Sequence, residues 1–268
     1  VHVGRDNFIS GLQKYFAKHA FANTTLGDLL VELTAASGKD LTTWVSNWLQ
    51  TAGVNTLRPV LDIDGDTYKS VTISQEAPLV PAGSKELRPH RLAVGLYDIS
   101  GNSLKLRKSV ELDVVGASTV VADLAGQKVA DLLLINDRDL SYAKLRFDNR
   151  SIATLKTHLG KFDDALARAL CWAAIWDMHR DAEISSADFI EIALNGLAGE
   201  SDDAIVNIVL AQLGTSVEAY TTDANRNSYR EKLADGLWAL TSSSAPGSDL
   251  QLLISRAFAI NAHTEAQT

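Results

Sequence analysis

The sequence predicts a multidomain α+β protein, in which a short helical segment precedes an all-β segment and then an all-α segment. Two changes in the spacing of apolar residues lead to this prediction. Apolar residues recur with helical spacing at the start of the chain, alternate with a period near two in the middle, and return to helical spacing after Asp148. We therefore expect three domains, over 1–56, 57–147 and 148–268.

Residues 1–54 predict three short helices. The first is marked by the helical spacing of the aromatic and apolar residues in Phe8–Phe16. Thr25 and Asp28 form a capping box that starts the second helix, and Gly38 suits its end.

The third helix carries two tryptophans on one face. Asp40 can cap this helix, and Gly53 can end it. Trp44 and Trp48 are four residues apart and so lie on adjacent turns. We interpret them as core residues; the alternative is an aromatic wall that faces a ligand.

The middle segment predicts a seven-stranded antiparallel β-sandwich. It consists of short runs rich in β-branched residues, separated by turn residues such as Asp64-Gly65-Asp66. No helix-length run interrupts them, which argues against a parallel βαβ arrangement. On the third run, Leu92, Val94 and Leu96 alternate and should face the core. The expected strands are Leu57–Ile63, Tyr68–Gln75, His90–Asp98, Leu104–Val114, Ser118–Leu124, Asp131–Ile135 and Tyr142–Phe147.

The last segment predicts a stacked, HEAT-like array of helices. Ser151 is expected to open a short helix, Asp163 or Asp164 a longer one, and the Ser185–Asp188 capping box a third. Helix after helix with short connectors is typical of such an array. Further helices are expected near 202–213, 217–240 and 249–263, with breaks at Gly196, Gly199, Gly214 and Pro246-Gly247.

Composition excludes several classes of function. With 46% hydrophobic and 22% charged residues, the chain has the make-up of a soluble globular protein. The net charge of −8, without a basic face, argues against a nucleic-acid partner. Apolar runs are too short to cross a membrane. The single cysteine, Cys171, excludes an intrachain disulfide and a four-cysteine zinc site.

Three side-chain groups could carry chemistry, and each has a plainer interpretation. His179 and Glu183 have the i, i+4 spacing of metal ligands on a helix, but no third ligand lies nearby, and a charged pair near a helix end explains them. His19 could act as a base, yet no carboxylate is spaced to orient it, so we expect a solvated or capping histidine. Cys171 lies in an apolar helix and is expected to be an inert buried thiol.

Three short motifs resemble ligand loops but fail on spacing. Asp62–Asp66 is similar to the start of a calcium loop, but Thr67 and Ile73 stand where that loop needs Gly and Glu, so a hairpin turn is expected. Asp137–Asp139 could bind a cation, and a charged turn between strands is the preferred interpretation. Ser37–Asp40 contains the Gly-Lys pair of a phosphate loop but lacks its other positions. We therefore expect no catalytic, cofactor-binding or metal-binding residue in these 268 residues.

Three stretches resemble one enzyme family in the same order along the chain. Residues 8–59, which include F-I-S-G-L-Q-K-Y-F-A-K-H and S-G-K-D-L-T-T-W-V-S-N-W-L-Q, resemble the end of the catalytic domain of aminopeptidase N family zinc metallopeptidases, the gluzincin aminopeptidases. Leu132–Asp148 resembles the junction between the connector sandwich and the C-terminal helical domain in actinobacterial-type members. Residues 166–178 resemble the first long helix of that domain, within which the chain is expected to stop.

The resemblance implies a function for a longer protein. In the family, two His and a Glu of the H-E-x-x-H system hold a zinc ion that activates water. No His is followed by Glu here, so the Zn²⁺ ligands are expected upstream of Val1 and none in this chain. The resemblance implies the non-catalytic C-terminal part of a cytoplasmic zinc-dependent aminopeptidase, which removes N-terminal residues from peptides and whose helical domain caps the active-site chamber.

The implied partners are peptide substrates of the parent enzyme and the upstream catalytic domain, with no nucleic acid and no membrane. The 268-residue chain alone is expected to be inactive. The alternative function is a non-catalytic protein-binding module built from a sandwich and a helical array, because both architectures serve many functions.

Overall fold

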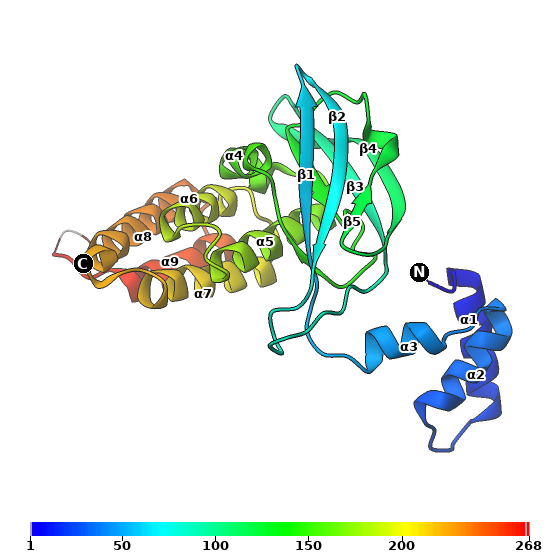
Figure 1. Cartoon of the computed structure of the whole chain (residues 1–268). Helices are drawn as coiled ribbons and strands as arrows, with labels where there is room; N and C mark the ends of the chain where they lie inside the picture. The colour runs from blue at the N-terminus through cyan, green and yellow to red at the C-terminus, as the bar shows by residue number, and fades with distance from the viewer. Residues whose placement is uncertain (1, 266, 268) are drawn as a thin grey trace.

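Figure 1 shows the computed structural model of the chain, which describes residues 2–265 and residue 267. The protein is mixed α+β, as predicted: N-terminal helices lie on one side of two β-sheets, and the C-terminal helices extend from the other side. Within the described residues, no helix combines the length and hydropathy needed to cross a membrane.

The three helices predicted over residues 1–54 are present: α1 (Arg5–Lys18), α2 (Leu26–Ser37) and α3 (Thr42–Leu49). The Thr25 backbone N–H donates to Asp28 Oδ2 at 2.8 Å, which is one half of the predicted capping box. Gly38 ends α2 in the left-handed conformation, with φ at +67°. Gly11 lets α1 approach α2 closely, since a Cβ there would lie 2.8 Å from Leu33 Cδ2.

The prediction that Trp44 and Trp48 are core residues is wrong, because both are half-buried and α3 contains no buried residue. Trp44 stacks on His2 with ring centroids 6.2 Å apart, and Trp48 meets the ring of His90 edge-on at 5.1 Å. Helix α3 runs between the α1–α2 pair and the sheets (Figure 1), so neither side covers its apolar face completely.

In the part of the chain that the structure describes, seven strands form two sheets, with strand orders β5-β2-β1-β7 and β4-β3-β6. β1 and β2 pair as a hairpin whose turn lies between Asp64 and Thr67, and β3 and β4 pair as a second hairpin. The strands are β1 (Thr56–Asp64), β2 (Thr67–Glu76), β3 (His90–Ser100), β4 (Ser103–Val114), β5 (Ser118–Val120), β6 (Leu132–Ile135) and β7 (Lys144–Leu145).

The sheets differ from the prediction at two edges. β7 pairs with β1 in parallel, with Thr56 opposite Lys144, so the arrangement is not purely antiparallel. The chain reaches this edge from β6 of the other sheet and not through a hairpin, and a hairpin is what enforces antiparallel pairing. The run predicted over Ser118–Leu124 pairs only as far as Val120, because the 3-10 turn η1 (Ala122–Leu124) carries Leu124 into the core.

Strand β3 is buried on both faces. Leu92, Val94 and Leu96 are fully buried, as their alternation predicts. Tyr97, on the opposite face, is buried too, because its ring packs edge-on against Phe162 at 5.2 Å in the connection between the C-terminal helices. The C-terminal part of the chain therefore covers the second face of this sheet.

The C-terminal part contains α4 (Asn149–His158), η2 (Leu159–Lys161), α5 (Ala165–Arg180), α6 (Ser186–Leu197), α7 (Asp203–Ala219), α8 (Asp223–Ser243) and α9 (Asp249–Asn261). Asp164 caps α5 and Ser185 caps α6, as predicted. Ser151 does not open α4, because Asp148 accepts the first free backbone N–H groups. Gly214 does not break a helix: it lies inside α7, where a missing side chain costs only about 1 kcal/mol.

One apolar cluster joins the sheets to the C-terminal helices. Its buried members extend from Leu57 in β1 to Ile254 in α9. Leu33 in α2 and Leu41, just before α3, are buried but lie outside this cluster, which has no member among residues 2–54. The sheets and the C-terminal helices thus share one core, and α1–α3 do not belong to it.

Candidate functional site

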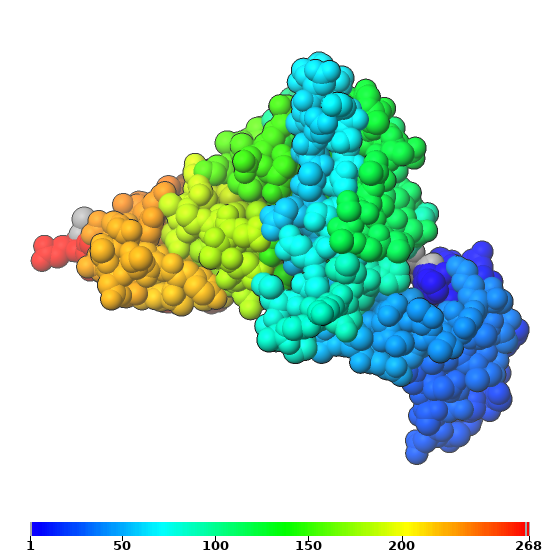
Figure 2. Space-filling model, in the orientation of Figure 1, coloured from blue at the N-terminus to red at the C-terminus, as the bar shows by residue number. Residues whose placement is uncertain are grey.

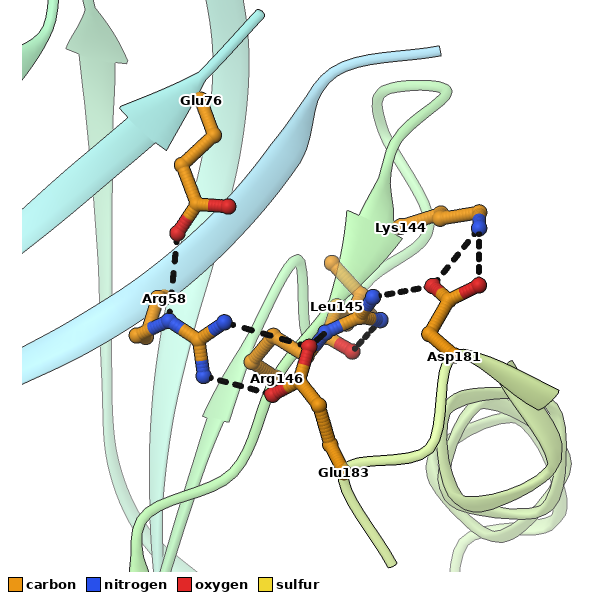
Figure 3. Close-up of polar contacts among 7 residues, drawn as sticks. All are labelled: Arg58, Glu76, Lys144, Leu145, Arg146, Asp181 and Glu183. Atoms are coloured by element: carbon orange, nitrogen blue, oxygen red, sulfur yellow. Dashed lines mark hydrogen bonds and ion pairs between the residues drawn. The ribbon is translucent and has the colours of Figure 1, made fainter. Parts of the chain in front are cut away.

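Six charged side chains meet where the β1–β7 edge of the first sheet faces the turn between α5 and α6 (Figure 3). The three cations all come from this edge, and two of the three carboxylates come from the helical turn. We call this group the junction cluster; its members are Arg58, Glu76, Lys144, Arg146, Asp181 and Glu183.

Glu183 is the centre of the junction cluster. Its Oε2 accepts from Arg58 Nη1 at 2.8 Å and its Oε1 from Arg58 Nη2 at 3.2 Å, a bidentate pair. The same Oε1 accepts from Arg146 Nε at 2.6 Å. Partial burial acts to raise the pKa of Glu183, but the hydrogen bonds from the two arginines outweigh it and hold that pKa below its ordinary value.

Asp181 binds the other end of the cluster. Its two oxygens accept from Lys144 Nζ at 2.9 and 2.7 Å, and Oδ2 also accepts from Arg146 Nη2. Arg146 is only 3% exposed and also donates to the Leu145 carbonyl. Arg146 is thus a buried guanidinium with two carboxylate partners, and loss of either carboxylate would leave part of its charge uncompensated.

The turn between α5 and α6 places both carboxylates on the same side. Ala182, between them, adopts the left-handed conformation with φ at +61°. Its N–H donates to the His179 carbonyl at 3.1 Å, and the Glu183 N–H donates to the Met178 carbonyl at 2.8 Å. This closed turn directs Asp181 and Glu183 toward the sheet (Figure 3).

His179 and Glu183 do not converge on one site, because α5 ends at Arg180. His179 is buried, stacks on Phe189 with centroids 4.7 Å apart, and has Nδ1 3.0 Å from the Ile184 carbonyl. Because His179 is buried, the interpretation of His179 and Glu183 as an exposed charged pair is also wrong. Glu183 belongs to the junction cluster, which the sequence did not reveal because its partners are 37 and 125 residues away.

Asp137 and Arg138 lie in a turn after β6, in agreement with the expected charged turn, but Asp137 is buried. It is 5% exposed, accepts from the Tyr97 hydroxyl and lies 3.3 Å from Ser109 Oγ. Burial raises its pKa. Arg138 and Asp139 are both exposed, and Arg138 donates to Glu111 at 2.8 Å.

The remaining candidates have structural roles. His19 ends α1, and Cys171 is fully buried, which raises the pKa of its thiol. Asp62 pairs with Lys69 at 3.3 Å beside the β1–β2 hairpin turn, as expected of a turn. Among the described residues, no group of three or more His, Cys, Asp or Glu side chains could hold a metal ion.

Residues 132–268 match the family described as ERAP1-like C-terminal domain. The chain belongs to this family and is a C-terminal portion of an aminopeptidase N family enzyme.

Three relatives show how far the similarity extends. Aminopeptidase N of Streptomyces lividans is 44% identical over 271 residues, which is 99% of this chain and 32% of that protein. Tricorn protease-interacting factor F2 of Thermoplasma volcanium is 23% identical over 217 residues, 79% of this chain and 24% of that protein. Aminopeptidase N of Escherichia coli (strain K12) is 30% identical over 108 residues, 40% of this chain and 12% of that protein. The chain spans about a third of the length of the Streptomyces protein and a smaller share of the other two.

Proposed function

We propose that this chain is the non-catalytic C-terminal part of a zinc-dependent, cytoplasmic aminopeptidase that removes N-terminal residues from peptides. The observation that supports the proposal most strongly is the 44% identity to an aminopeptidase N over 99% of the chain. The zinc ion and the reacting groups would be supplied by the catalytic domain, because the described residues contain no cluster that fits a metal.

Each part of the chain has a proposed role. Residues 1–56 complete the catalytic domain, residues 57–147 form a sandwich that acts as a connector, and residues 148–268 begin a HEAT-like helical domain that caps the active-site chamber. The cavity of about 700 Å³ between α2 and α3 supports the first role. Its lining includes Leu30 and Val31, and Val31 is 58% exposed, as expected of a face that another domain covers.

Activity and metal content of two proteins test this proposal. One is the 268-residue chain, and the other is a longer protein that carries an aminopeptidase N catalytic domain ahead of it. We expect the longer protein to hold one zinc ion after dialysis against a weak chelator and to hydrolyse an aminoacyl anilide. The shorter chain should do neither, because three protein ligands are needed for a catalytic zinc. Tightly held zinc together with hydrolysis in the shorter chain would overturn the proposal.

A further inference from the structure

Two adjoining cavities lie between the N-terminal helices and the sheet β4-β3-β6. In the space-filling view α1–α3 form a lobe beside one end of the sheets (Figure 2). The larger cavity, of about 500 Å³, is lined by Lys39 from the helical side and by Arg91 of β3 from the sheet side. The smaller cavity, of about 230 Å³, is lined by α3 and residues 140–142, and it shares His2, Pro89 and Arg91 with the larger one. Together the two cavities have the size of an ordinary small-molecule site.

The larger cavity is lined by charges of both signs. Lys39 and Arg91 supply two cations, and Asp113 supplies one carboxylate. The two histidines of the lining, His2 and His90, are neutral near pH 7, because burial lowers the pKa of each ring. The cavity therefore has an excess of positive charge and still contains one acceptor for a cation.

These charged groups retain hydrogen-bonding capacity for a ligand. Arg91 lies 3.3 Å from Glu111 and 3.4 Å from Asp113, both longer than the about 2.8 Å of a tight charge-assisted hydrogen bond. The Lys39 ammonium donates to the His2 carbonyl at 2.5 Å and forms no ion pair among the described residues. Because an ammonium has three donors and a guanidinium five, both cations can still bind a ligand carboxylate.

The smaller cavity is largely aromatic. Trp44 and Trp48 of α3 line it together with Tyr142. The Trp44 ring stacks on His2, and the Trp48 ring meets His90 edge-on with centroids 5.1 Å apart. Aromatic walls of this kind favour an apolar or aromatic group over a charged one.

Two polar atoms lie unpaired where the cavities meet. Trp48 Nε1 and His90 Nε2 are buried and have no hydrogen-bond partner among the described residues. The other ring nitrogen of His90 is 2.7 Å from Ser141 Oγ, so only one side of this ring is satisfied. Since buried polar atoms in folded proteins are nearly always paired, the groups of the protein leave this wall incomplete.

We propose that the two cavities form a binding site for a free α-amino acid with an apolar or aromatic side chain. The carboxylate of the ligand binds Lys39 and Arg91, and its ammonium binds Asp113. Its side chain enters the smaller cavity beside Trp44 and Tyr142. Charges of both signs next to an aromatic space carry this inference, because a simple anion site needs neither a carboxylate nor an apolar chamber.

The link between this site and the parent enzyme rests on the proposed function. If that function holds, amino acids of this class are products of the enzyme, and the site binds a released product. The site itself depends only on the cavities of this chain, so its test needs no peptidase activity.

Calorimetric titration of the 268-residue chain with L-phenylalanine tests the site. Three further probes each lack one feature of the ligand: 3-phenylpropionate lacks the ammonium, glycine lacks the side chain, and inorganic phosphate lacks both. We expect saturable binding of L-phenylalanine and at least about tenfold weaker binding of each other probe. Absence of saturable L-phenylalanine binding would overturn the proposal. Equal affinity for any of the three other probes would overturn it too, and for phosphate it would indicate a simple anion site.

Substitutions separate the parts of the site. Arg91→Met and Trp44→Ala should each weaken L-phenylalanine binding at least about tenfold. Asp113→Asn should weaken L-phenylalanine to the same extent but leave 3-phenylpropionate unchanged, because that probe has no ammonium. The control is Lys105→Met, which removes an exposed cation that lies 4.0 Å from Asp163 outside both cavities, and it should change neither affinity. Unchanged L-phenylalanine affinity in Arg91→Met and Asp113→Asn would overturn the assignment.

Indole N–H signals in NMR spectra locate the ligand in the unsubstituted chain. Saturation with L-phenylalanine should shift the signals of Trp44 and Trp48 and leave that of Trp238, 56% exposed in α8, in place. Binding that shifts only Trp238, or shifts all three equally, would place the ligand elsewhere and overturn the site. A chain that binds L-phenylalanine as described, but forms no peptidase when joined to a catalytic domain, would overturn only the proposed function.

Discussion

At the scale of single residues, the protein depends on buried charges whose partners are distant in sequence. Arg146 and Arg88 are both almost fully buried, but they are compensated differently. Arg146 has the carboxylates of Asp181 and Glu183, whereas Arg88 has the carbonyl end of a helix. The first arrangement joins two parts of one core, and the second holds a separate part at one point.

Glu183→Gln should lower the free energy of unfolding by about 2 kcal/mol, because it removes the charge that compensates Arg58 and Arg146. Urea unfolding measures the change. The matched control is Glu218→Gln, which removes an exposed pair with Arg230 and should cost less than about 1 kcal/mol. Equal losses in the two variants would mean that the junction cluster contributes no more than a surface ion pair.

His90 should make the protein less stable in mild acid. Burial, and then the nearby Arg88, lower the pKa of His90 from 6.5 to about 4. Its Nδ1 is 2.7 Å from Ser141 Oγ, and its buried Nε2 has no hydrogen-bond partner among the described residues, so a second proton there would be unpaired. The folded state therefore favours neutral His90.

Between pH 6.5 and about 4 the unfolded chain binds a proton that the folded chain does not. Stability contributed by neutral His90 is therefore complete above pH 6.5, falls as the pH is lowered through this window, and levels off below about 4. The loss should reach about 3 kcal/mol. Urea unfolding at several pH values, compared with His90→Gln, measures it; the variant should lose less stability over the same window. An identical pH dependence in the two proteins would exclude His90 as the cause.

At the scale of elements, the alternation of apolar residues determines which side chains form the core of β3. Val94 is fully buried, so Val94→Ala should cost about 1–3 kcal/mol of unfolding free energy through lost burial and a partial cavity. Val120→Ala on the edge strand β5 is the control, because Val120 is 62% exposed and should cost a few tenths at most. Thermal or urea unfolding distinguishes the two, and equal costs would place the strand in another register.

Local patterns predicted the elements better than their pairing. Capping residues such as Thr25 and Ser185 act within one turn, so the helix starts that they mark could be predicted. The parallel pairing of Lys144 with Thr56 depends on how the chain crosses between sheets, which no local pattern records. Gly214 was expected to break a helix but lies inside α7, because the packing of that helix outweighs the low helix propensity of one glycine.

The candidate site was less predictable than the fold for the same reason. Asp181 and Glu183 look like ordinary residues of a helix end, and only the folded chain brings Arg58 to them. The half-burial of Trp48 likewise depends on where α3 lies between two larger parts, and not on the apolar face of the helix itself. Spacing within a helix carries no information about either contact.

At the scale of the whole molecule, the described residues form one body with a shared apolar core and one separate group of helices. The body contains both sheets and the C-terminal helices, which share a core and the junction cluster. Helices α1–α3 have few buried apolar residues and depend on Arg88 and Trp48 for their attachment. A segment of this kind should open locally with a low free energy.

Hydrogen exchange on the unchanged chain tests this division most directly. Amides within residues 1–54 should exchange well before those of residues 142–180, since only the second group lies in the shared core. The measurement is made at a concentration where the protein is monomeric, so that association does not protect the exposed faces of α1–α3. Equal protection of the two regions in the monomer would contradict the account.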